Sequence, residues 1–254
     1  MEKMKKEELI KKWEDTQIHW DDTEFLATKA NALMKKRWQR LNKTVTGIIS
    51  NEVVANNEYV NMLDIGAGRG DFYKNVQDLI KKYTGIEPSE QMLKNEIMED
   101  DFILKRGTGE ELNEGTGFDV VLIKEVLDHC YDPEKVLLNS YNALKEKGII
   151  IITLTNKDSY YKQIFKKRAE KLEEEHKDHL YNFNIKEVSE LLAKAGFKIE
   201  KVMSTNYLRL PFVIEEIIGR LPAGLVYFIL NATDSLARTF LDSKGGSFII
   251  IARK

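Results

Sequence analysis

The stretch from Tyr59 to Asp71 constrains the fold more than any other part of the chain; it reads Tyr-Val-Asn-Met-Leu-Asp-Ile-Gly-Ala-Gly-Arg-Gly-Asp. An apolar run carries Asp64 near its end, glycines follow at alternate positions, and a helix-like segment begins. Glycine adopts positive φ freely and lets a ligand approach the backbone closely. A following helix presents free N–H groups and a positive dipole end to an anionic group. The stretch therefore predicts a strand, a tight loop and a helix start that bind a nucleotide.

The spacing of the glycines narrows the class of ligand. Dinucleotide-binding loops carry the fingerprint Gly-x-Gly-x-x-Gly. Counted from Gly66, the third glycine of that fingerprint would fall at position 71, which is Asp71. Residues Gly66 to Gly70 instead read Gly-Ala-Gly-Arg-Gly. An NAD-linked oxidoreductase is therefore disfavoured.

A second acidic residue ends the next expected strand. Residues 83–87 form a short apolar run that ends at Glu87, and Pro88 suits the first position of a following helix. A carboxylate about 20 residues after a glycine loop is placed to accept two hydrogen bonds from ribose hydroxyls. The alternative is that Glu87 only favours the start of that helix. Given the glycine loop, we expect the ribose role, with Pro88 beside it in the binding site.

From residue 58 onward the pattern alternates between strands and helices, which is typical of a mostly parallel sheet covered on both faces by helices. Helices are expected at 71–82, 89–98, 133–145 and 184–195. Strands are expected at 59–65, 83–87, 102–105, 118–124, 148–154, 197–204 and 247–253. The chain is therefore expected to form a single α/β domain whose core comprises residues 53–205 and 246–254.

Composition excludes several classes of protein. The 254 residues are 43% hydrophobic and 31% charged, which suits one buried core. The formal net charge of -2, without a basic stripe among aromatic residues, disfavours a nucleic-acid partner. The sequence contains no apolar run of about 18 residues, so no transmembrane helix is expected. The single cysteine, Cys130, excludes an intramolecular disulfide and multi-cysteine zinc sites. We therefore expect a cytoplasmic protein without a metal site.

Together these motifs resemble the class I S-adenosylmethionine (SAM)-dependent methyltransferases over residues 58–254. Asp64 with the glycine loop resembles motif I of that family, and Lys-Glu-Val-Leu-Asp-His-Cys-Tyr-Asp-Pro follows the fourth expected strand as residues 124–133. The nearest likeness is to small-molecule methyltransferases of ubiquinone and menaquinone biosynthesis. The resemblance implies a Rossmann-like sheet of seven strands in the order 3-2-1-4-5-7-6, with the last strand antiparallel. It also implies SAM as the cofactor, with S-adenosylhomocysteine as the product.

The resemblance assigns cofactor roles by position. Asp64 orders the glycine loop near the amino-acid end of SAM, and Gly66, Ala67 and Gly68 let the backbone pass beside it. Lys124 ends strand four, where a backbone carbonyl in relatives meets the cofactor's ammonium group. The side chain of Lys124 is expected to point elsewhere.

The adenine is expected against the loop of residues 106–112. Many relatives carry an aspartate where this chain has Thr108, so the sequence departs from the family at this point. Thr108 can still accept one hydrogen bond, and Glu110 can take the place of the aspartate. A backbone N–H of Gly109 or Glu110 can serve a ring nitrogen. The alternative is that this loop is an exposed acidic turn.

His129 is the candidate catalytic residue, because it follows strand four and is expected near the transferred methyl group. An imidazole can deprotonate a hydroxyl nucleophile near neutral pH. In relatives of varied chemistry a histidine here often only holds the loop, and both roles stay open, as they do for Asp128. Asp132 before Pro133 is typical of a helix N-cap. His179 falls in a region that lines acceptor pockets in relatives, with a packed or exposed histidine as the alternative.

Three segments outside the core can reach the sheet edge where ligands bind: residues 1–52, 155–182 and 206–245. The first is expected to be a helical cap, and residues 157–177 are expected to form an amphipathic lid helix. Residues 206–245 are apolar enough to predict a helical lid over an apolar acceptor, or a contact with a membrane surface. Packing onto the core, or a homodimer interface, is the alternative for this insert.

The sequence thus predicts an enzyme that moves the methyl group of SAM, by in-line displacement, to a small apolar or aromatic acceptor. The sulfonium donor already carries a good leaving group, so the protein must mainly orient the acceptor and exclude water. A base is needed only if the nucleophile is protonated. The alternative is an interaction module that binds SAM or S-adenosylhomocysteine without transferring a methyl group.

Overall fold

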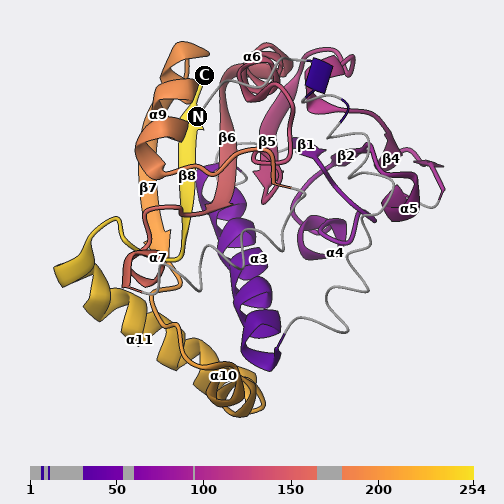
Figure 1. Ribbon diagram of the computed structural model, residues 1–254. Helices are drawn as coiled ribbons and strands as arrows, with labels where there is room; N and C mark the ends of the chain where they lie inside the picture. The colour runs from indigo at the N-terminus through magenta and orange to yellow at the C-terminus, as the bar shows by residue number, and fades with distance from the viewer. Residues whose placement is uncertain (1–6, 9–10, 12–30, 54–59, 94, 165–178) are drawn as a thin grey trace.

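The computed structural model describes residues 7–8, 11, 31–53, 60–93, 95–164 and 179–254, and they form a central sheet flanked by helices (Figure 1). Eight strands pair in the order β3-β4-β2-β1-β5-β6-β8-β7. The strands are β1 Asn61–Ile65, β2 Lys82–Glu87, β3 Ile97–Met98, β4 Phe102–Arg106, β5 Phe118–Lys124, β6 Leu144–Thr155, β7 Lys198–Thr205 and β8 Ser247–Arg253.

The strand order confirms the predicted topology. Seven of the strands lie in the predicted order, because β4, β2, β1, β5, β6, β8 and β7 correspond to strands 3, 2, 1, 4, 5, 7 and 6. The last strand, β8, pairs antiparallel with both β6 and β7, as predicted. The eighth strand is β3, which adds an antiparallel edge beside β4.

The described helices are α3 Ala32–Glu52, α4 Tyr73–Val76, α5 Glu90–Leu93, α6 Pro133–Ala143, α7 Tyr160–Ile164, α9 Ile185–Lys194, α10 Phe212–Gly219 and α11 Ala223–Leu241, with a 3₁₀ turn, η2, at Gly109–Glu111. None of these described helices combines the length and apolar character that crossing a bilayer requires. Of the predicted lid helix at 157–177, residues 165–177 lie outside the described residues, as does most of the predicted cap before residue 31.

Two predicted helices are wrong in part, since strand pairing replaces their ends. The expected helix at 89–98 ends at Leu93, and Ile97 and Met98 instead pair with Leu104 and Ile103 of β4. The expected helix at 71–82 is reduced to α4, which turns at 77–79 follow, and Lys82 pairs with Asn61 of β1. Hydrogen bonding to a neighbouring strand satisfies these backbone groups and overrides the local helical spacing.

Helix starts follow the capping chemistry of the sequence, with one correction. Asp132 caps α6, with its carboxylate accepting the N–H of Lys135, as predicted. Asn184 caps α9 in a reciprocal capping box with Glu187. Pro88 does not occupy the first helical position, because α5 begins two residues later, after Ser89. A serine hydroxyl can accept the free N–H groups of the first turn, which a proline ring cannot do.

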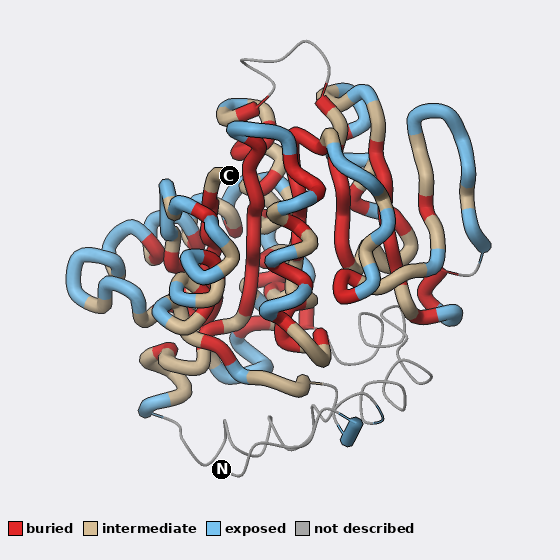
Figure 2. Tube along the Cα trace, turned by 90° about the horizontal axis from the view of Figure 1, so that it is seen from above, coloured by how far each residue is buried: buried red, intermediate tan, exposed pale blue. Residues whose placement is uncertain are grey.

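The sheet is covered on both faces, and β5 shows why. Its burial is continuous, so its alternate residues point into two different apolar clusters. Val121 and Ile123 pack with α6 and α9, while Val120 and Leu122 pack with α3 and α4. In Figure 2 the central strands are accordingly buried along most of their length.

The insert between β7 and β8 is helical, as predicted, and leaves the sheet at one edge. Strand β7 runs in the same direction as β6, since both pair antiparallel with β8. The chain after β7 therefore begins at the carboxyl edge of the parallel strands, and α10 and α11 lie together with α3 beyond that edge (Figure 1). Ligands bind at this edge in open α/β sheets.

Candidate cofactor and acceptor site

The loop after β1 is built on glycines that no other residue could replace without strain. Gly66, Gly68 and Gly70 have φ values of 73°, 58° and 73°, a region that favours glycine. A Cβ atom on Gly66 would lie only 2.4 Å from the side chain of Val126. The predicted glycine loop is therefore present, and it packs directly against the segment that follows β5.

Glu87 holds this loop with both of its carboxylate oxygens. Oε2 accepts the N–H of Gly68 and Oε1 accepts the N–H of Ser89, each at 2.9 Å. The N–H of Ala67 donates to the carbonyl of Ile86 at 3.0 Å. A carboxylate oxygen has two lone pairs, and 6% of the surface of Glu87 is exposed. The structure thus joins the glycine loop to the end of β2 at Glu87, and the ribose role of Glu87 stays a prediction.

Asp64 lies buried at the end of β1, with 2% of its surface exposed. Its carboxylate accepts a hydrogen bond from the Tyr83 hydroxyl of β2. Burial raises the pKa of Asp64 to about 6, although the positive charge of Lys124 and the bond from Tyr83 act in the opposite direction. Burial also raises the pKa of Tyr83 well above its usual range, so its hydroxyl remains a donor.

The side chain of Lys124 is directed toward α3, and its expected orientation away from the cofactor stays a prediction. Its Nζ donates to Oδ1 of Asn42 in α3 at 3.0 Å and lies 5.0 Å from the centre of the Phe72 ring. Its charge lowers the pKa of Asp64, so the side chain stays near motif I. The contact between the Lys124 carbonyl and the cofactor ammonium stays a prediction.

The loop expected to hold adenine is tied to the chain after β5. Thr108 caps η2, with its hydroxyl accepting the N–H of Glu111 at 3.2 Å. Glu110 is 2% exposed and accepts the N–H of Asp132 at 3.2 Å, and burial raises its pKa. Because Gly109 and Glu110 are buried, this loop is not an exposed acidic turn. Their contacts with adenine stay predictions.

Beyond β5, the structure assembles an acid–imidazole cluster from Asp128, His129 and His179. Nδ1 of His179 lies 2.7 Å from Oδ2 of Asp128, and Nε2 of His129 lies 3.9 Å from Oδ1 of the same aspartate. The two imidazole rings lie 4.5 Å apart. Burial alone would raise the pKa of Asp128, but the hydrogen bond from His179 and the charges of both histidines outweigh it and lower the pKa. Asp128 is therefore a buried carboxylate that stabilises positive charge on imidazole.

The backbone of Asp128 also fixes the segment that carries His179. The carbonyl of Asp128 accepts the N–H groups of Leu180 and Tyr181, at 2.9 and 3.1 Å. Both the side chain and the main chain of one residue thus hold the end of the segment before α9. From the sequence, Asp128, His129 and His179 were separate candidates, and their contact was not predicted.

Glu125 belongs to the same region and was missed from the sequence. It has a φ of 56°, unusual for a residue with a side chain, and its Oε1 accepts the hydroxyl of Thr153 at 2.9 Å. Burial, followed by repulsion from Asp128, raises the pKa of Glu125 to about 7, opposed by Thr153 and by the charges of His179 and Lys124. The spacing of Glu125, Asp128 and His129 at i, i+3 and i+4 was a signal that could have grouped them.

The cluster has the donor set of a metal site as well as that of a proton acceptor. Asp128, His129 and His179 each offer one ligand atom, and these atoms lie within 4.8 Å of one another. Among the described residues, Oδ1 of Asp128 is buried without a hydrogen-bond partner. One carboxylate and two imidazoles suit zinc or iron. The expectation of no metal site therefore stays a prediction.

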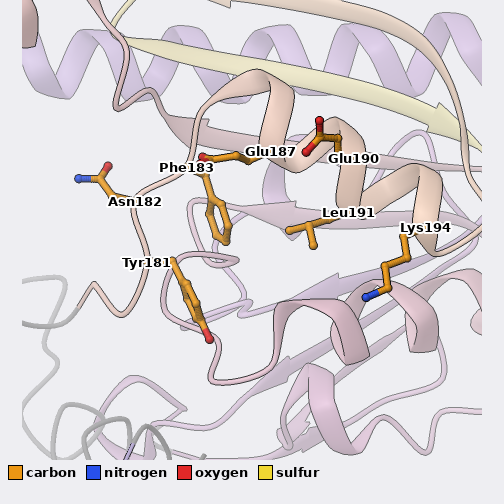
Figure 3. Close-up of a pocket in the computed structure, with 7 residues that line it drawn as sticks. All are labelled: Tyr181, Asn182, Phe183, Glu187, Glu190, Leu191 and Lys194. Atoms are coloured by element: carbon orange, nitrogen blue, oxygen red, sulfur yellow. The ribbon is translucent and has the colours of Figure 1, made fainter. Parts of the chain in front are cut away.

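A shallow hollow of about 370 Å³ lies elsewhere, along α9 and the residues before it (Figure 3). Tyr181 and Phe183 line one side with rings 5.4 Å apart, and Leu191 lines the other. None of the glycine-loop residues contributes to it. This hollow is therefore separate from the predicted cofactor site.

Comparison with known proteins agrees with this geometry. Residues 21–202 match the family described as Methyltransferase domain. An uncharacterized protein of Methanocaldococcus jannaschii is 33% identical over 152 residues, which cover 57% of this chain and 68% of that protein. A ubiquinone biosynthesis O-methyltransferase of Caulobacter vibrioides is 34% identical over 107 residues, which cover 39% of this chain and only 42% of the relative.

Solved structures share the fold. A SAM-dependent methyltransferase of Thermotoga maritima superposes with a TM-score of 0.54 at 22% identity, covering 87% of this chain and 94% of the other. The phosphoethanolamine N-methyltransferase 2 of Haemonchus contortus, solved with S-adenosyl-L-methionine, gives a TM-score of 0.57 at 19% identity, covering 91% and 59%. With the family match over most of the chain, these findings establish that the protein belongs to the methyltransferase-domain family of class I SAM-dependent methyltransferases.

Proposed function

We propose that the protein transfers the methyl group of SAM to a hydroxyl of a small acceptor with an apolar or aromatic body. The observation that carries this proposal is the cluster of Asp128, His129 and His179 in and near the segment that follows β5. Val126 packs against Gly66, and the cluster begins two residues after Val126. The segment that carries Asp128 and His129 therefore packs against the predicted cofactor loop, which supports a proton acceptor near it.

The cofactor roles in this proposal follow the sequence predictions. Glu87 accepts hydrogen bonds from the ribose hydroxyls, with Pro88 beside it. Asp64 and the carbonyl of Lys124 serve the amino-acid end of SAM, where the cofactor is cationic. Residues 108–110 form the adenine side. Support comes from the joint attachment of Gly68 and Ser89 to one buried carboxylate.

The reaction needs one proton acceptor and careful orientation. The acceptor oxygen attacks the methyl carbon, the bond from carbon to the sulfonium sulfur breaks, and the sulfur keeps the electron pair as S-adenosylhomocysteine. The hydroxyl proton passes to an imidazole. His179 is favoured for this role, because Oδ2 of Asp128 lies 2.7 Å from its Nδ1, which orients the ring and stabilises the imidazolium that forms. His129, the residue predicted from the sequence, is the alternative acceptor in the same cluster.

Cofactor binding tests the first half of the proposal. Calorimetric titration with S-adenosylhomocysteine should give saturable one-to-one binding, and NAD should give none. Glu87→Gln places an amide where the carboxylate accepts two N–H groups, so we expect about a tenfold or greater loss of affinity. Glu146→Gln, whose side chain is 89% exposed and lies outside the predicted cofactor site, is the matched control and should bind as the parent does. Equal affinity in all three proteins would remove Glu87 from the cofactor site.

Methyl transfer tests the second half. Labelled SAM is offered with a panel of phenols and aliphatic alcohols, and His179→Asn is compared with His129→Asn. A larger loss of kcat in His179→Asn, with unchanged binding of S-adenosylhomocysteine, supports His179 as the proton acceptor. The reverse order assigns that role to His129. Cofactor binding without transfer to any acceptor would favour the alternative, an interaction module that binds SAM without using it.

A bound cation is the second way in which this cluster could activate a hydroxyl. The compact set of one carboxylate and two imidazoles favours it specifically. A metal would lower the pKa of a coordinated hydroxyl, so a separate base would be unnecessary. Loss of transfer on treatment with a chelator, with recovery on adding Zn²⁺ or Fe²⁺, would assign the cluster to a metal. Unchanged transfer would leave it as the proton acceptor.

A cytoplasmic location is part of this proposal. Cys130, the single cysteine of the sequence, is buried as a free thiol. Reducing compartments keep such thiols unpaired. Fractionation of cells that produce the protein, followed by detection with an antibody, tests the location directly.

A further inference from the structure

The outer side of the insert carries an unusual amount of exposed apolar surface. Of thirteen exposed large hydrophobic side chains among the described residues, nine lie between Phe212 and Phe240. They are Phe212, Val213, Ile214, Ile217, Leu221, Leu225, Phe228, Leu236 and Phe240. We call these nine residues the apolar surface. Contiguous apolar surface of this kind marks an interaction site in most proteins that carry it.

On α11 the exposed residues form one stripe along the helix. Leu225, Phe228, Leu236 and Phe240 recur at helical spacing, with Ala232 exposed between them. Val226, Leu230 and Asp234 are buried on the opposite side. A helix of 19 residues is about 28 Å long, so the stripe is an extended and regular surface.

The acidic residues that anchor these helices are turned inward and leave the stripe uncharged. Glu215 of α10 pairs with Arg37 of α3 at 2.6 Å, and Asp234 of α11 pairs with Arg40 at 2.8 Å. All four side chains are at most 10% exposed. The two ion pairs fix α10 and α11 on α3, and they keep Glu215 and Asp234 away from the outer side of these helices.

Cationic side chains border the apolar surface. Lys43 is exposed on α3, and its Nζ lies 5.4 Å from the ring centre of Tyr227 in α11. Lys35 is exposed two turns earlier on α3, close enough for its charge to act on Glu216 of α10. Arg220, between α10 and α11, is 75% exposed and pairs with Glu216 at 2.9 Å. The helices that carry and support the apolar surface thus present three cationic side chains and one partly exposed acidic side chain, Glu216.

We propose that the apolar surface docks on a lipid bilayer with anionic headgroups, as a peripheral contact. Phenylalanine and leucine side chains would enter the headgroup and acyl boundary, while Lys35, Lys43 and Arg220 meet the anionic headgroups. A symmetric dimer fits less well, because an isologous interface would bring the same cationic border of two copies together. The surface lies beyond the carboxyl edge of the sheet, so docking turns the predicted acceptor site toward the membrane.

Flotation of the full-length chain with vesicles tests the docking, and it is independent of methyl transfer. We expect the protein to float with mixed phosphatidylcholine and phosphatidylglycerol vesicles, and less with phosphatidylcholine alone. Phe228→Ser with Phe240→Ser should weaken binding about tenfold or more, since both side chains are mostly exposed and serve no core contact. Met98→Ser with Leu138→Ser removes two exposed apolar side chains outside the apolar surface and should bind as the parent does.

Two further measurements distinguish docking on a bilayer from self-association of the chain. Lys35→Gln with Lys43→Gln should abolish the preference for anionic vesicles and leave the weaker binding to phosphatidylcholine. Sedimentation velocity without lipid should show monomers across the concentration range. Failure to float, equal flotation of the two serine double variants, or a dimer that only Phe228→Ser with Phe240→Ser dissociates would overturn the proposal. In the last case a second copy of the chain covers the surface.

Discussion

Nδ1 of His179 lies 2.7 Å from Oδ2 of Asp128, which joins the segment before α9 to the segment after β5. The Asp128 side chain is 6% exposed and the His179 side chain 35%, so a buried acid holds a base that solvent or a ligand can reach. This arrangement fixes the orientation of the imidazole and stabilises its protonated form. The proposed transfer chemistry depends on that pair.

Asp128→Asn should abolish most methyl transfer while leaving cofactor binding intact. The amide cannot stabilise the imidazolium that forms when His179 takes the proton, so we expect kcat to fall about a hundredfold. Asp132→Asn is the matched control, because asparagine caps a helix as well as aspartate does. Transfer is measured with saturating SAM, and binding is measured by calorimetry with S-adenosylhomocysteine. An Asp128→Asn protein with full kcat would contradict the role of the pair.

Gly66→Ala should destabilise the fold strongly, because a Cβ at this residue would lie 2.4 Å from Val126 and the φ of 73° disfavours alanine. We expect a loss of about 2 kcal/mol or more in the free energy of unfolding. Gly47→Ala in α3 is the control: nothing lies within 4 Å of the added Cβ, and alanine favours the helix by about 1 kcal/mol. Urea denaturation distinguishes the two. We expect Gly66→Ala to lower the free energy of unfolding and Gly47→Ala to raise it.

Asp64 should make stability depend on pH between about 4 and 6. Its pKa is raised from the ordinary value to about 6 in the folded protein, so folding takes up a proton in that range. The contribution of Asp64 to the free energy of unfolding is greatest below the pKa that Asp64 has in the unfolded chain. About 3 kcal/mol of it is lost as the pH rises through 6. Asp64→Asn cannot titrate and should lack this loss.

The check on Asp64 is urea denaturation of parent and variant across that pH range. The stability of Asp64→Asn relative to the parent should rise with pH and level off above about pH 6. Asp71→Asn is the control, because the Asp71 side chain is 73% exposed and its substitution should leave the pH profile unchanged. A parent–variant difference that stays constant with pH would rule out a raised pKa at Asp64.

Glu215→Gln should loosen the helical insert. The carboxylate of Glu215 accepts hydrogen bonds from Arg37, Asn31 and the backbone of Leu210, so neutralising it leaves Arg37 as a buried charge without its counterion. We expect destabilisation of about 3 kcal/mol. Limited proteolysis should cut first around α10. Arg220→Ala breaks only an exposed pair and should leave both readouts unchanged; equal protease resistance in both variants would contradict the anchoring role.

Local features of the sequence were sufficient for the glycine loop, for the end of β2 at Glu87 and for the helix start at Asp132. Gly66 is required by backbone conformation, and such a requirement is visible in the residue type itself. Asp132 caps its helix through atoms only a few residues away. Local chemistry of this kind needs no knowledge of the rest of the chain. The order of the strands followed from the family resemblance and not from any single motif.

Predictions from the local sequence pattern were incomplete where a segment distant in the sequence supplied the hydrogen-bond partner. Ile97 and Met98 became a strand because β4 offered them hydrogen bonds. Lys124 reached Asn42 because α3 folds back over this side of the sheet. Neither partner can be read from the residues near it in sequence, since long-range packing is what decides between two locally acceptable conformations.

The sequence by itself determined the nucleotide-binding corner, the alternation of strands and helices, and the apolar character of residues 206–245. Only the tertiary structure decided that His179 meets Asp128, that Glu125 sits beside them in a left-handed conformation, and that Glu215 is buried. The physical reason is that backbone conformation and hydrophobic spacing are local properties. The pairing of charges depends on which segments the folded sheet and helices bring within a few ångströms of one another.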